Sequence, residues 1–260
     1  MKINFRGNQA VVKFGTGARP GEALAMEFVH RHAPPSSIPL PRVIGLWSSE
    51  STSASEGKSS TIHYIVTEWV ENAETLEDVW PHLGSSSKET IVFQLRKILQ
   101  TLRQLEPPDG VSYIGSAGRL PCADPIIRDK GPFDSIDAFN AGYLEVARPC
   151  FRGHHISVIE RLLERIKQYR IVFTHGDLAL SNILVRTRTL GATSESEEWD
   201  VVALIDWECA GWYPEHWEYI KLLNCVKWKS DWASYAQSLL ERHYDDDFIL
   251  DSRLRLYYRI

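Results

Sequence analysis

The order of a few polar residues along the chain constrains its fold more than any other feature of the sequence. A lysine lies on an early apolar strand, a glutamate begins the next helix, the pattern HxDxxxxN follows much later, and a further apolar strand ends in an aspartate. These residues are Lys13, Glu22, His175, Asp177, Asn182 and Asp206. Each one alone is explained as a turn, cap or edge residue. The complete order is hard to obtain by chance, so it predicts a specific fold.

The first seventy residues are typical of short strands around a single helix. The segments KINFR, AVVKF and HYIVTEWV are rich in branched and aromatic residues and are bounded by Gly, Asn or Ser, which favours strands. Between the second and third segments, residues 21–33 carry apolar side chains at helical spacing. We expect the order strand, strand, helix, strand. The serine-rich stretch 48–60 is interpreted as a solvated loop tip.

The rest of the chain is mainly helical. An apolar stripe predicts a core helix over 88–105, Asp134 and Ser135 can cap the start of a second helix, and a third covers 156–169. Two strands interrupt this pattern, NILVRT and WDVVALIDW, and the segment LGATSESEE joins them as an exposed hairpin loop. A last helix is expected to start at Pro214, because proline suits the first turn of a helix.

The composition of the chain indicates which partners it does not bind and in which cellular compartment it is expected. With 260 residues and 43% hydrophobic content, the chain can form one large domain or two lobes. A net charge of −5 provides no broad basic face, so we expect neither nucleic acid nor a membrane as partner. The chain has no apolar leader and no stretch long enough to span a membrane, and its cysteines lack CxxC spacing, which favours reduced thiols and a cytoplasmic protein. Those cysteines are Cys122, Cys150, Cys209 and Cys225.

The stretch FTHGDLALSNILV and the later VVALIDWE carry groups suited to phosphoryl transfer. Asp177 lies in a loop after an apolar run, Asn182 follows five residues later, and Asp206 ends the strand VVALI. This reaction needs one group to orient the acceptor hydroxyl and two oxygen ligands for Mg²⁺. His175 is interpreted as a brace for the loop, because a carboxylate already holds the role of base.

The segment HGDLALSN resembles the catalytic loop of the aminoglycoside phosphotransferase and choline kinase family. The run IDWECAGWYPEHWEYIKLL is similar to fungal members, and SIPLPRV, YIGS and GPFDS also match, so the resemblance covers nearly the whole chain. It implies an α+β, protein kinase-like fold of two lobes, over 1–70 and 71–260. It further implies ATP and Mg²⁺ as cofactors, Asp177 as catalytic base, Asn182 and Asp206 as metal ligands, and a small hydroxylated molecule as acceptor.

The resemblance also assigns the nucleotide-binding residues. Lys13 would contact the phosphates and pair with Glu22, which we prefer to Glu27 on the same helix because the family places its glutamate at the helix start. The strand YIVTEWV would connect the lobes, with backbone groups near Glu68 and Val70 available to adenine. The acceptor's identity and the oligomeric state are left open.

The chain departs from the family pattern at two places. Ser181 stands where relatives often carry a basic residue, and few residues precede Lys13, so we expect the phosphate-covering loop to be short or absent. This second departure favours the alternative of a pseudo-kinase that binds a nucleotide or a partner without catalysis. A metal-dependent hydrolase is a third and weaker alternative, since the multi-carboxylate set of a two-metal centre is missing.

Overall fold

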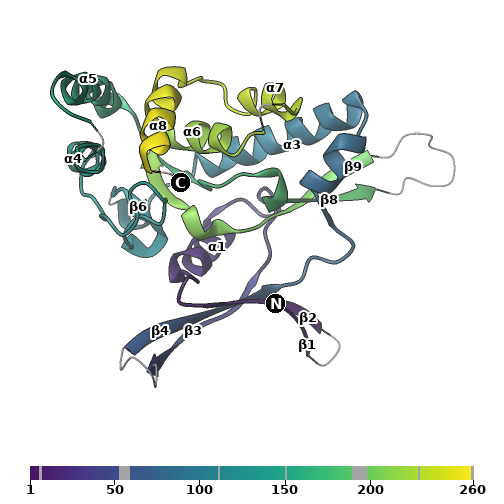
Figure 1. Ribbon diagram of the computed structural model, residues 1–260. Coiled ribbons are helices and arrows are strands. Elements are labelled where there is room, and N and C mark those ends of the chain that lie inside the picture. Colours follow the sequence, from purple (N-terminus) through teal and green to yellow (C-terminus); the bar gives the residue numbers. More distant parts are fainter. Residues whose placement is uncertain are drawn as a thin grey trace.

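The computed structural model describes residues 1–5, 8–52, 59–110, 112–149, 151–188, 198–227 and 229–258. One part of the chain is a four-stranded antiparallel sheet in the order β1-β2-β4-β3, at the lower side of Figure 1. Its strands are β1 (Lys2–Phe5), β2 (Asn8–Gly15), β3 (Val43–Thr52) and β4 (Ser59–Glu68). Helix α1 (Pro20–His32) follows β2 and lies between this sheet and the remainder of the molecule (Figure 1).

Strand β3 was not among the predicted strands, and the interpretation of 48–60 as a loop tip is wrong over most of its length. Ser48 to Thr52 belong to β3 and Ser59 begins β4, while residues 53–58 lie outside the described residues. Pairing with β4 outweighs the polar composition, because an exposed antiparallel strand tolerates serine. Aromatic stacking across β2, β4 and β3 fixes the register through three rings, those of Phe14, Tyr64 and Trp47.

Helix α1 belongs to two cores. Ala23 packs with Ala18 and Ile65 against the small sheet, whereas Met26 and Val29 join the main core of the molecule. Because both clusters contact one rigid helix, the helix fixes the sheet against the rest of the chain.

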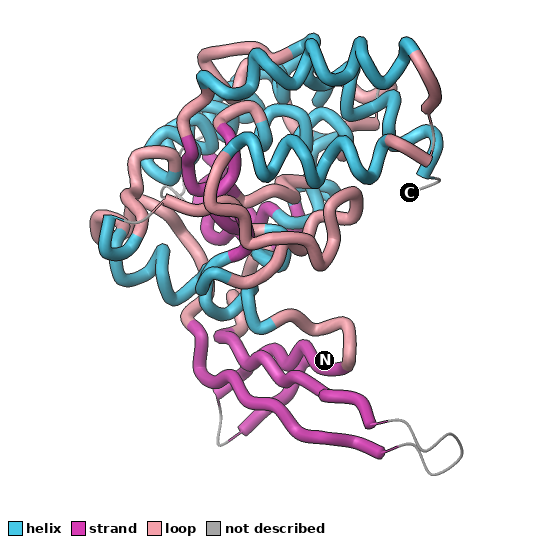
Figure 2. Tube along the Cα trace, turned by 90° about the vertical axis from the view of Figure 1, so that its left-hand side faces the viewer, coloured by secondary structure: helices cyan, strands magenta, loops and turns pink. Residues whose placement is uncertain are grey.

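The larger part is built mainly from helices (Figure 2). They are α2 (Leu76–Val79), α3 (Ser85–Leu102), α4 (Ile136–Ala147), α5 (His154–Leu163), α6 (Trp217–Asn224), α7 (Trp232–Gln237) and α8 (Asp245–Tyr258). The predicted helices over 88–105 and 156–169 correspond to α3 and α5, with ends a few residues away. Ser135 caps α4 as predicted, since its hydroxyl accepts a hydrogen bond from the amide of Ala138 at 3.1 Å.

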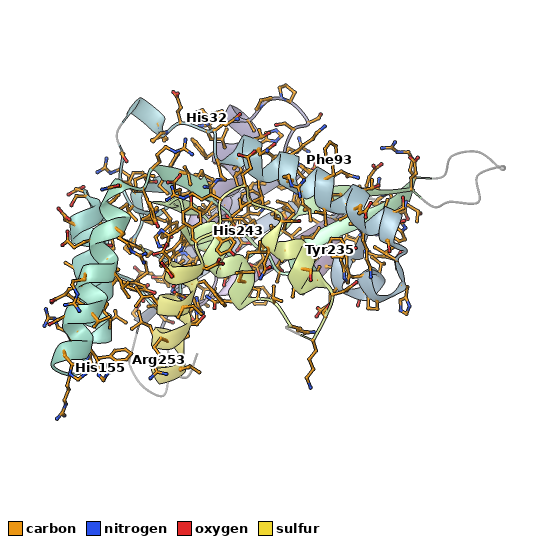
Figure 3. The ribbon with its side chains drawn as sticks, turned by 90° about the horizontal axis from the view of Figure 1, so that it is seen from above. His32, Phe93, His155, Tyr235, His243 and Arg253 are labelled. Carbon is orange, nitrogen blue, oxygen red and sulfur yellow. The ribbon has the colours of Figure 1, made fainter. Side chains whose placement is uncertain are left out.

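Figure 3 shows the helical part from above. Phe93 marks the exposed side of α3, while His155 on α5 and Arg253 on α8 lie at the same outer end of the molecule. Among the described residues, no helix combines the length and apolar character needed to cross a bilayer.

Two small sheets cross the helical part. One has the order β6-β10-β7 and the other β5-β8-β9. Their strands are β5 (Glu74–Thr75), β6 (Gly115–Ser116), β7 (Ile171–Thr174), β8 (Ile183–Arg188), β9 (Glu198–Leu204) and β10 (Gly211–Pro214). The antiparallel pair β8 and β9 was predicted, but eight residues of its expected loop, 190–197, lie outside the described residues.

The predicted helix start at Pro214 is wrong. Pro214 ends β10, where it pairs with Ile171 of β7, and α6 begins only at Trp217. The proline therefore serves at a strand end, where its missing N–H costs little.

Gly211 supplies a test of this packing. A Cβ atom at Gly211 would overlap the carbonyl oxygen of Gly115 and would lie 2.8 Å from the Cα of Ser116. Backbone cannot yield as a flexible side chain does, so we expect Gly211→Ala to lower the free energy of unfolding by about 1–3 kcal/mol. Denaturant unfolding would measure this against Gly17→Ala, where a Cβ meets nothing within 4 Å. Equal stability of the two variants would contradict the close approach of β6 and β10.

Candidate functional site

The hairpin of β8 and β9 brings Asn182 and Asp206 to the same end of one sheet. Ile183 pairs with Leu204, so Asn182 precedes one strand at the point where the other strand ends. The amide of Ile205 donates to the carbonyl of Asn182 at 3.0 Å. This bond holds Asn182 against Ile205, the residue immediately before Asp206.

Asp177 lies beside Asn182. The Asn182 side-chain amide donates to the Asp177 carbonyl at 2.9 Å and to its carboxylate Oδ2 at 3.1 Å. The other oxygen, Oδ1, lies 3.4 Å from the sulfur of Cys225. Burial raises the pKa of Asp177, and the hydrogen bonds from Cys225 and Asn182 oppose this shift without cancelling it. A carboxylate with a raised pKa is a better proton acceptor than an ordinary aspartate.

His175 holds the loop in place, in agreement with its predicted bracing role. It is fully buried, its Nε2 lies 3.1 Å from the carbonyl of Ile205, and its Nδ1 accepts from the amide of Asp177 at 3.3 Å. These partners require a proton on Nε2. Burial lowers the pKa of His175 to about 4, so the ring is neutral at neutral pH. Its neutral state suits a structural contact between the loop and the end of β9.

Glu218 of α6 anchors the same loop from the other side. Its carboxylate accepts the amide of His175 at 2.6 Å and the amide of Gly176 at 3.3 Å. Gly176 has a φ of 76°, and a Cβ there would approach the Cys209 carbonyl oxygen to 2.7 Å. Only glycine fits such a left-handed residue beside a second backbone segment.

From the sequence we expect Glu215, Glu218 and Asp245 to Asp247 to form a solvated acidic surface, and the structure contradicts this expectation at three positions. Glu218 is fully buried, and Glu215 and Asp247 are buried as well. Glu215 accepts hydrogen bonds from Arg170 and Arg242, and Asp247 from Tyr169, which satisfies most of their buried oxygens.

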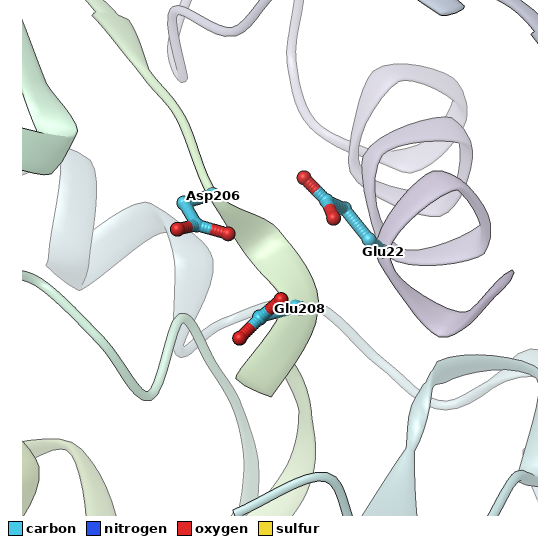
Figure 4. A group of neighbouring side chains, drawn as sticks. All are labelled: Glu22, Asp206 and Glu208. Atoms are coloured by element: carbon cyan, nitrogen blue, oxygen red, sulfur yellow. The ribbon is translucent and has the colours of Figure 1, made fainter. Parts of the chain in front are cut away.

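Lys13 lies at the centre of a cluster of carboxylates. Its ammonium is 2.8 Å from Glu22, 2.7 Å from Asp206 and 2.8 Å from Glu208. Figure 4 shows these three carboxyl groups directed toward a common space between α1 and the segment after β9. Burial by itself lowers the pKa of Lys13, but the three carboxylates raise it by more, so the lysine stays charged. The expected ion pair with Glu22 is present, whereas Glu27 is exposed.

A cavity of about 500 Å³ lies between the small sheet and the helical part. Its wall includes Lys13, Glu22 and Asp206 together with both predicted hinge residues, Glu68 and Val70. The amide of Glu68 already donates to the carbonyl of Arg42 at 2.9 Å, so it is held within the sheet. Asp177 and Asn182 do not contribute to the wall. Asn182 is hydrogen-bonded to Ile205, and Ile205 is part of the wall.

The model of the phosphotransferase enzyme family matches residues 5–254. The chain belongs to this family. No curated protein sequence matches the chain.

Solved structures of aminoglycoside phosphotransferases share the fold of this phosphotransferase family member. A thermostable mutant of APH(4)-Ia, in a ternary complex with ADP and hygromycin B, is 14% identical with a TM-score of 0.55, over 99% of this chain and 78% of that one. The GDP and kanamycin complex of APH(2")-IIIa is 15% identical with a TM-score of 0.55, over 97% and 77%. The predicted α+β, protein kinase-like fold is thereby confirmed.

Three residues at the site of this phosphotransferase family member were missed by sequence reasoning. They are Glu208, Glu218 and Cys225, none of which the sequence analysis assigned to the site. One signal was available for Glu218, because it lies on α6 between Trp217 and Tyr219 in an aromatic stretch that is buried throughout. The described cysteines Cys122, Cys209 and Cys225 are free thiols, and Cys150 lies outside the described residues.

The buried Glu218 predicts a particular dependence of stability on pH. Burial raises its pKa from an ordinary value near 4.5 to about 7, against the opposing effect of the two amides. Between these values the folded protein holds a proton that the unfolded chain has lost, so the contribution of Glu218 to stability falls as pH rises and is constant above about 7. Its full range is on the order of 3 kcal/mol.

We expect Glu218→Gln to remove this dependence, because glutamine keeps one oxygen for both amides and does not titrate. The unfolding free energies of the wild type and the variant would be measured from pH 4.5 to 8. As the pH rises over this range, the wild type should lose on the order of 3 kcal/mol of stability relative to the variant. Other titrating groups, including His175, act in both proteins and cancel in the difference. Parallel curves would contradict the prediction.

Proposed function

We propose that the chain transfers the γ-phosphate of ATP to a hydroxyl of a small molecule in a Mg²⁺-dependent reaction with Asp177 as base. The observation that carries the proposal is the paired Lys13 and Glu22 lining a cavity beside Asp206, with Asp177 joined to the same hairpin through Asn182. Phosphoryl transfer relies on positioning and on charge stabilisation, and these residues supply both. The proposal divides the chain into a nucleotide-binding lobe, 1–70, and a catalytic and substrate lobe, 71–260, and keeps a cytoplasmic location.

The cavity has the size and chemistry that a nucleotide requires. Ile65 and Leu184 give it apolar walls for the adenine ring, and the backbone near Glu68 and Val70 lies in the same wall. Volumes of this order are usual for sites that enclose a cofactor. In the proposed complex, Lys13 exchanges part of its carboxylate contacts for phosphate oxygens.

Asn182 and Asp206 fit the role of Mg²⁺ ligands. The amide nitrogen of Asn182 is engaged by Asp177, which turns its oxygen Oδ1 away from that contact. Within the described part of the chain, Lys13 is the one positively charged partner of the Asp206 carboxylate. Hard oxygen donors of this type suit Mg²⁺, which when bound neutralises charge on the transferred phosphate.

Asp177 is placed to accept the proton of the acceptor hydroxyl. Burial raises its pKa, which makes the carboxylate more basic than an ordinary aspartate. The similar proteins of known structure were solved with the small molecules hygromycin B and kanamycin, which supports an acceptor of that general size. The proposal names no particular antibiotic.

Two aspartate variants test the proposal. Release of ADP with water as acceptor and the thermal shift caused by ATP with Mg²⁺ would be measured on the purified chain. We expect Asp206→Asn to remove the metal-dependent shift, because a carboxylate ligand is lost. Asp177→Asn should keep the shift and lower ADP release by a factor on the order of 10²–10⁴. A shift without ADP release in the wild type would instead support the pseudo-kinase, and no shift at saturating nucleotide would reject the nucleotide site.

Glu22 and Glu27 offer a matched pair on one helix. Glu22 contacts Lys13 at 2.8 Å and is buried, whereas Glu27 is exposed one and a half turns further along α1. We expect Glu22→Gln to weaken ATP binding by about tenfold or more, because the position of Lys13 is then less restricted. Glu27→Gln should leave binding unchanged. Titration calorimetry with a non-hydrolysable ATP analogue would compare the two, and equal affinities would contradict the assigned pair.

A further inference from the structure

The two oxygens of the Asp177 carboxylate have different donors. Asn182, five residues away in the same loop, donates to Oδ2 at 3.1 Å. Cys225, at the C-terminal end of α6, places its sulfur 3.4 Å from Oδ1. The first contact belongs to the family motif, whereas the second comes from a distant segment and has no role in the proposed function as stated above.

The thiol of Cys225 is suited to donate this hydrogen bond. The Cys225 residue is exposed at the surface, yet desolvation by the protein around its sulfur raises its pKa to about 12, and the neighbouring charge of Asp177 acts in the same direction. The sulfur therefore carries its proton at neutral pH, and S–H is a donor toward a carboxylate.

Helix α6 presents Cys225 from a fixed position. Glu218, Lys221 and Cys225 are spaced at i, i+3 and i+7, so they share one face of the helix. Glu218 holds the amides of His175 and Gly176 at the start of the loop. The same helix face thus contacts both the backbone of the loop and the side chain of Asp177.

Buried ion pairs hold this helix end. The ammonium of Lys221, of which only 2% is exposed, lies 3.0 Å from Asp124 and 3.1 Å from Asp251. Asn224, immediately before Cys225, donates to Asp251 as well. A buried pair of this kind is costly to break, so it keeps the element that carries the thiol in one position.

We infer that Cys225 is a positioning residue for Asp177, and that its thiol fixes the plane of the carboxylate for the acceptor hydroxyl. The torsion that turns a carboxylate is otherwise broad. With one donor on each oxygen, only one plane of the Asp177 carboxylate satisfies both hydrogen bonds. This inference rests on the proposed function, in which Asp177 is the base.

The test compares Cys225→Ala with Cys225→Ser. We expect the alanine variant to lower kcat for ADP release about tenfold, the effect of losing one hydrogen bond to a charged group. The KM for ATP and the thermal shift with ATP and Mg²⁺ should not change, since the thiol lies outside the nucleotide cavity. Serine restores a donor and should recover most of kcat. Cys122→Ala removes a thiol elsewhere and should leave kcat unchanged; because Cys122 is fully buried, the melting temperature of this variant is measured alongside.

A double variant shows whether Cys225 acts through Asp177. In the Asp177→Asn background, Cys225→Ala should cause no further loss, because the group that it positions is already inactive. Three results would overturn the inference. They are an unchanged kcat in Cys225→Ala, an equal loss of kcat in both backgrounds, or no recovery of kcat in Cys225→Ser when its melting temperature shows that this variant is folded. Failure of the proposed function looks different, since the wild type would then show no ADP release that depends on Asp177.

Discussion

The ion cluster around Lys13 is the interaction on which the arrangement of the molecule depends. The ammonium comes from β2 of the small sheet, while its partners come from α1 and from the segment after β9. Lys13, Asp206 and Glu208 are partly exposed, but Glu22 is buried, so its carboxylate depends on the Lys13 ammonium as its counter-charge. The small sheet, α1 and the segment after β9 are therefore held in a relative position in which Lys13 contacts Glu22, Asp206 and Glu208 together.

The backbone at Asp206 follows from the same requirement. Its φ of 62° and ψ of 62° are left-handed, a conformation that costs an ordinary residue about 1–2 kcal/mol but that aspartate tolerates better than most. The turn directs the carboxylate to Lys13 and lets the next residue, Trp207, bury its ring with Nε1 bonded to the carbonyl of Leu204 at 2.9 Å. The strain is thus offset by an ion pair on one side and a buried aromatic ring on the other.

The sequence predicted correctly which residues lie together where they are close along the chain, and it failed where tertiary contacts decide the structure. The spacing from His175 to Asp206 predicted a shared site because loop and strand end are continuous stretches of chain. Strand β3 was missed although its first half, VIGLW, has the composition of a strand; in its second half, SSEST, pairing with β4 and not composition makes it a strand. Glu218 and Cys225 were missed because their partners lie more than forty residues away, so only the packing of α6 against the loop reveals them.

The two sides of the site differ in how freely their charges can exchange partners. Lys13, Asp206 and Glu208 are each about one-third exposed, so water can replace a lost contact while phosphates and metal enter. The pairs that hold α6 are 2% exposed or less, so no solvent compensates for breaking them. In the proposed reaction this contrast is useful, because a nucleotide must be bound and released at every turnover whereas the base must keep one orientation. The fold thus places adaptable ion pairs beside the cavity and rigid ones behind Asp177.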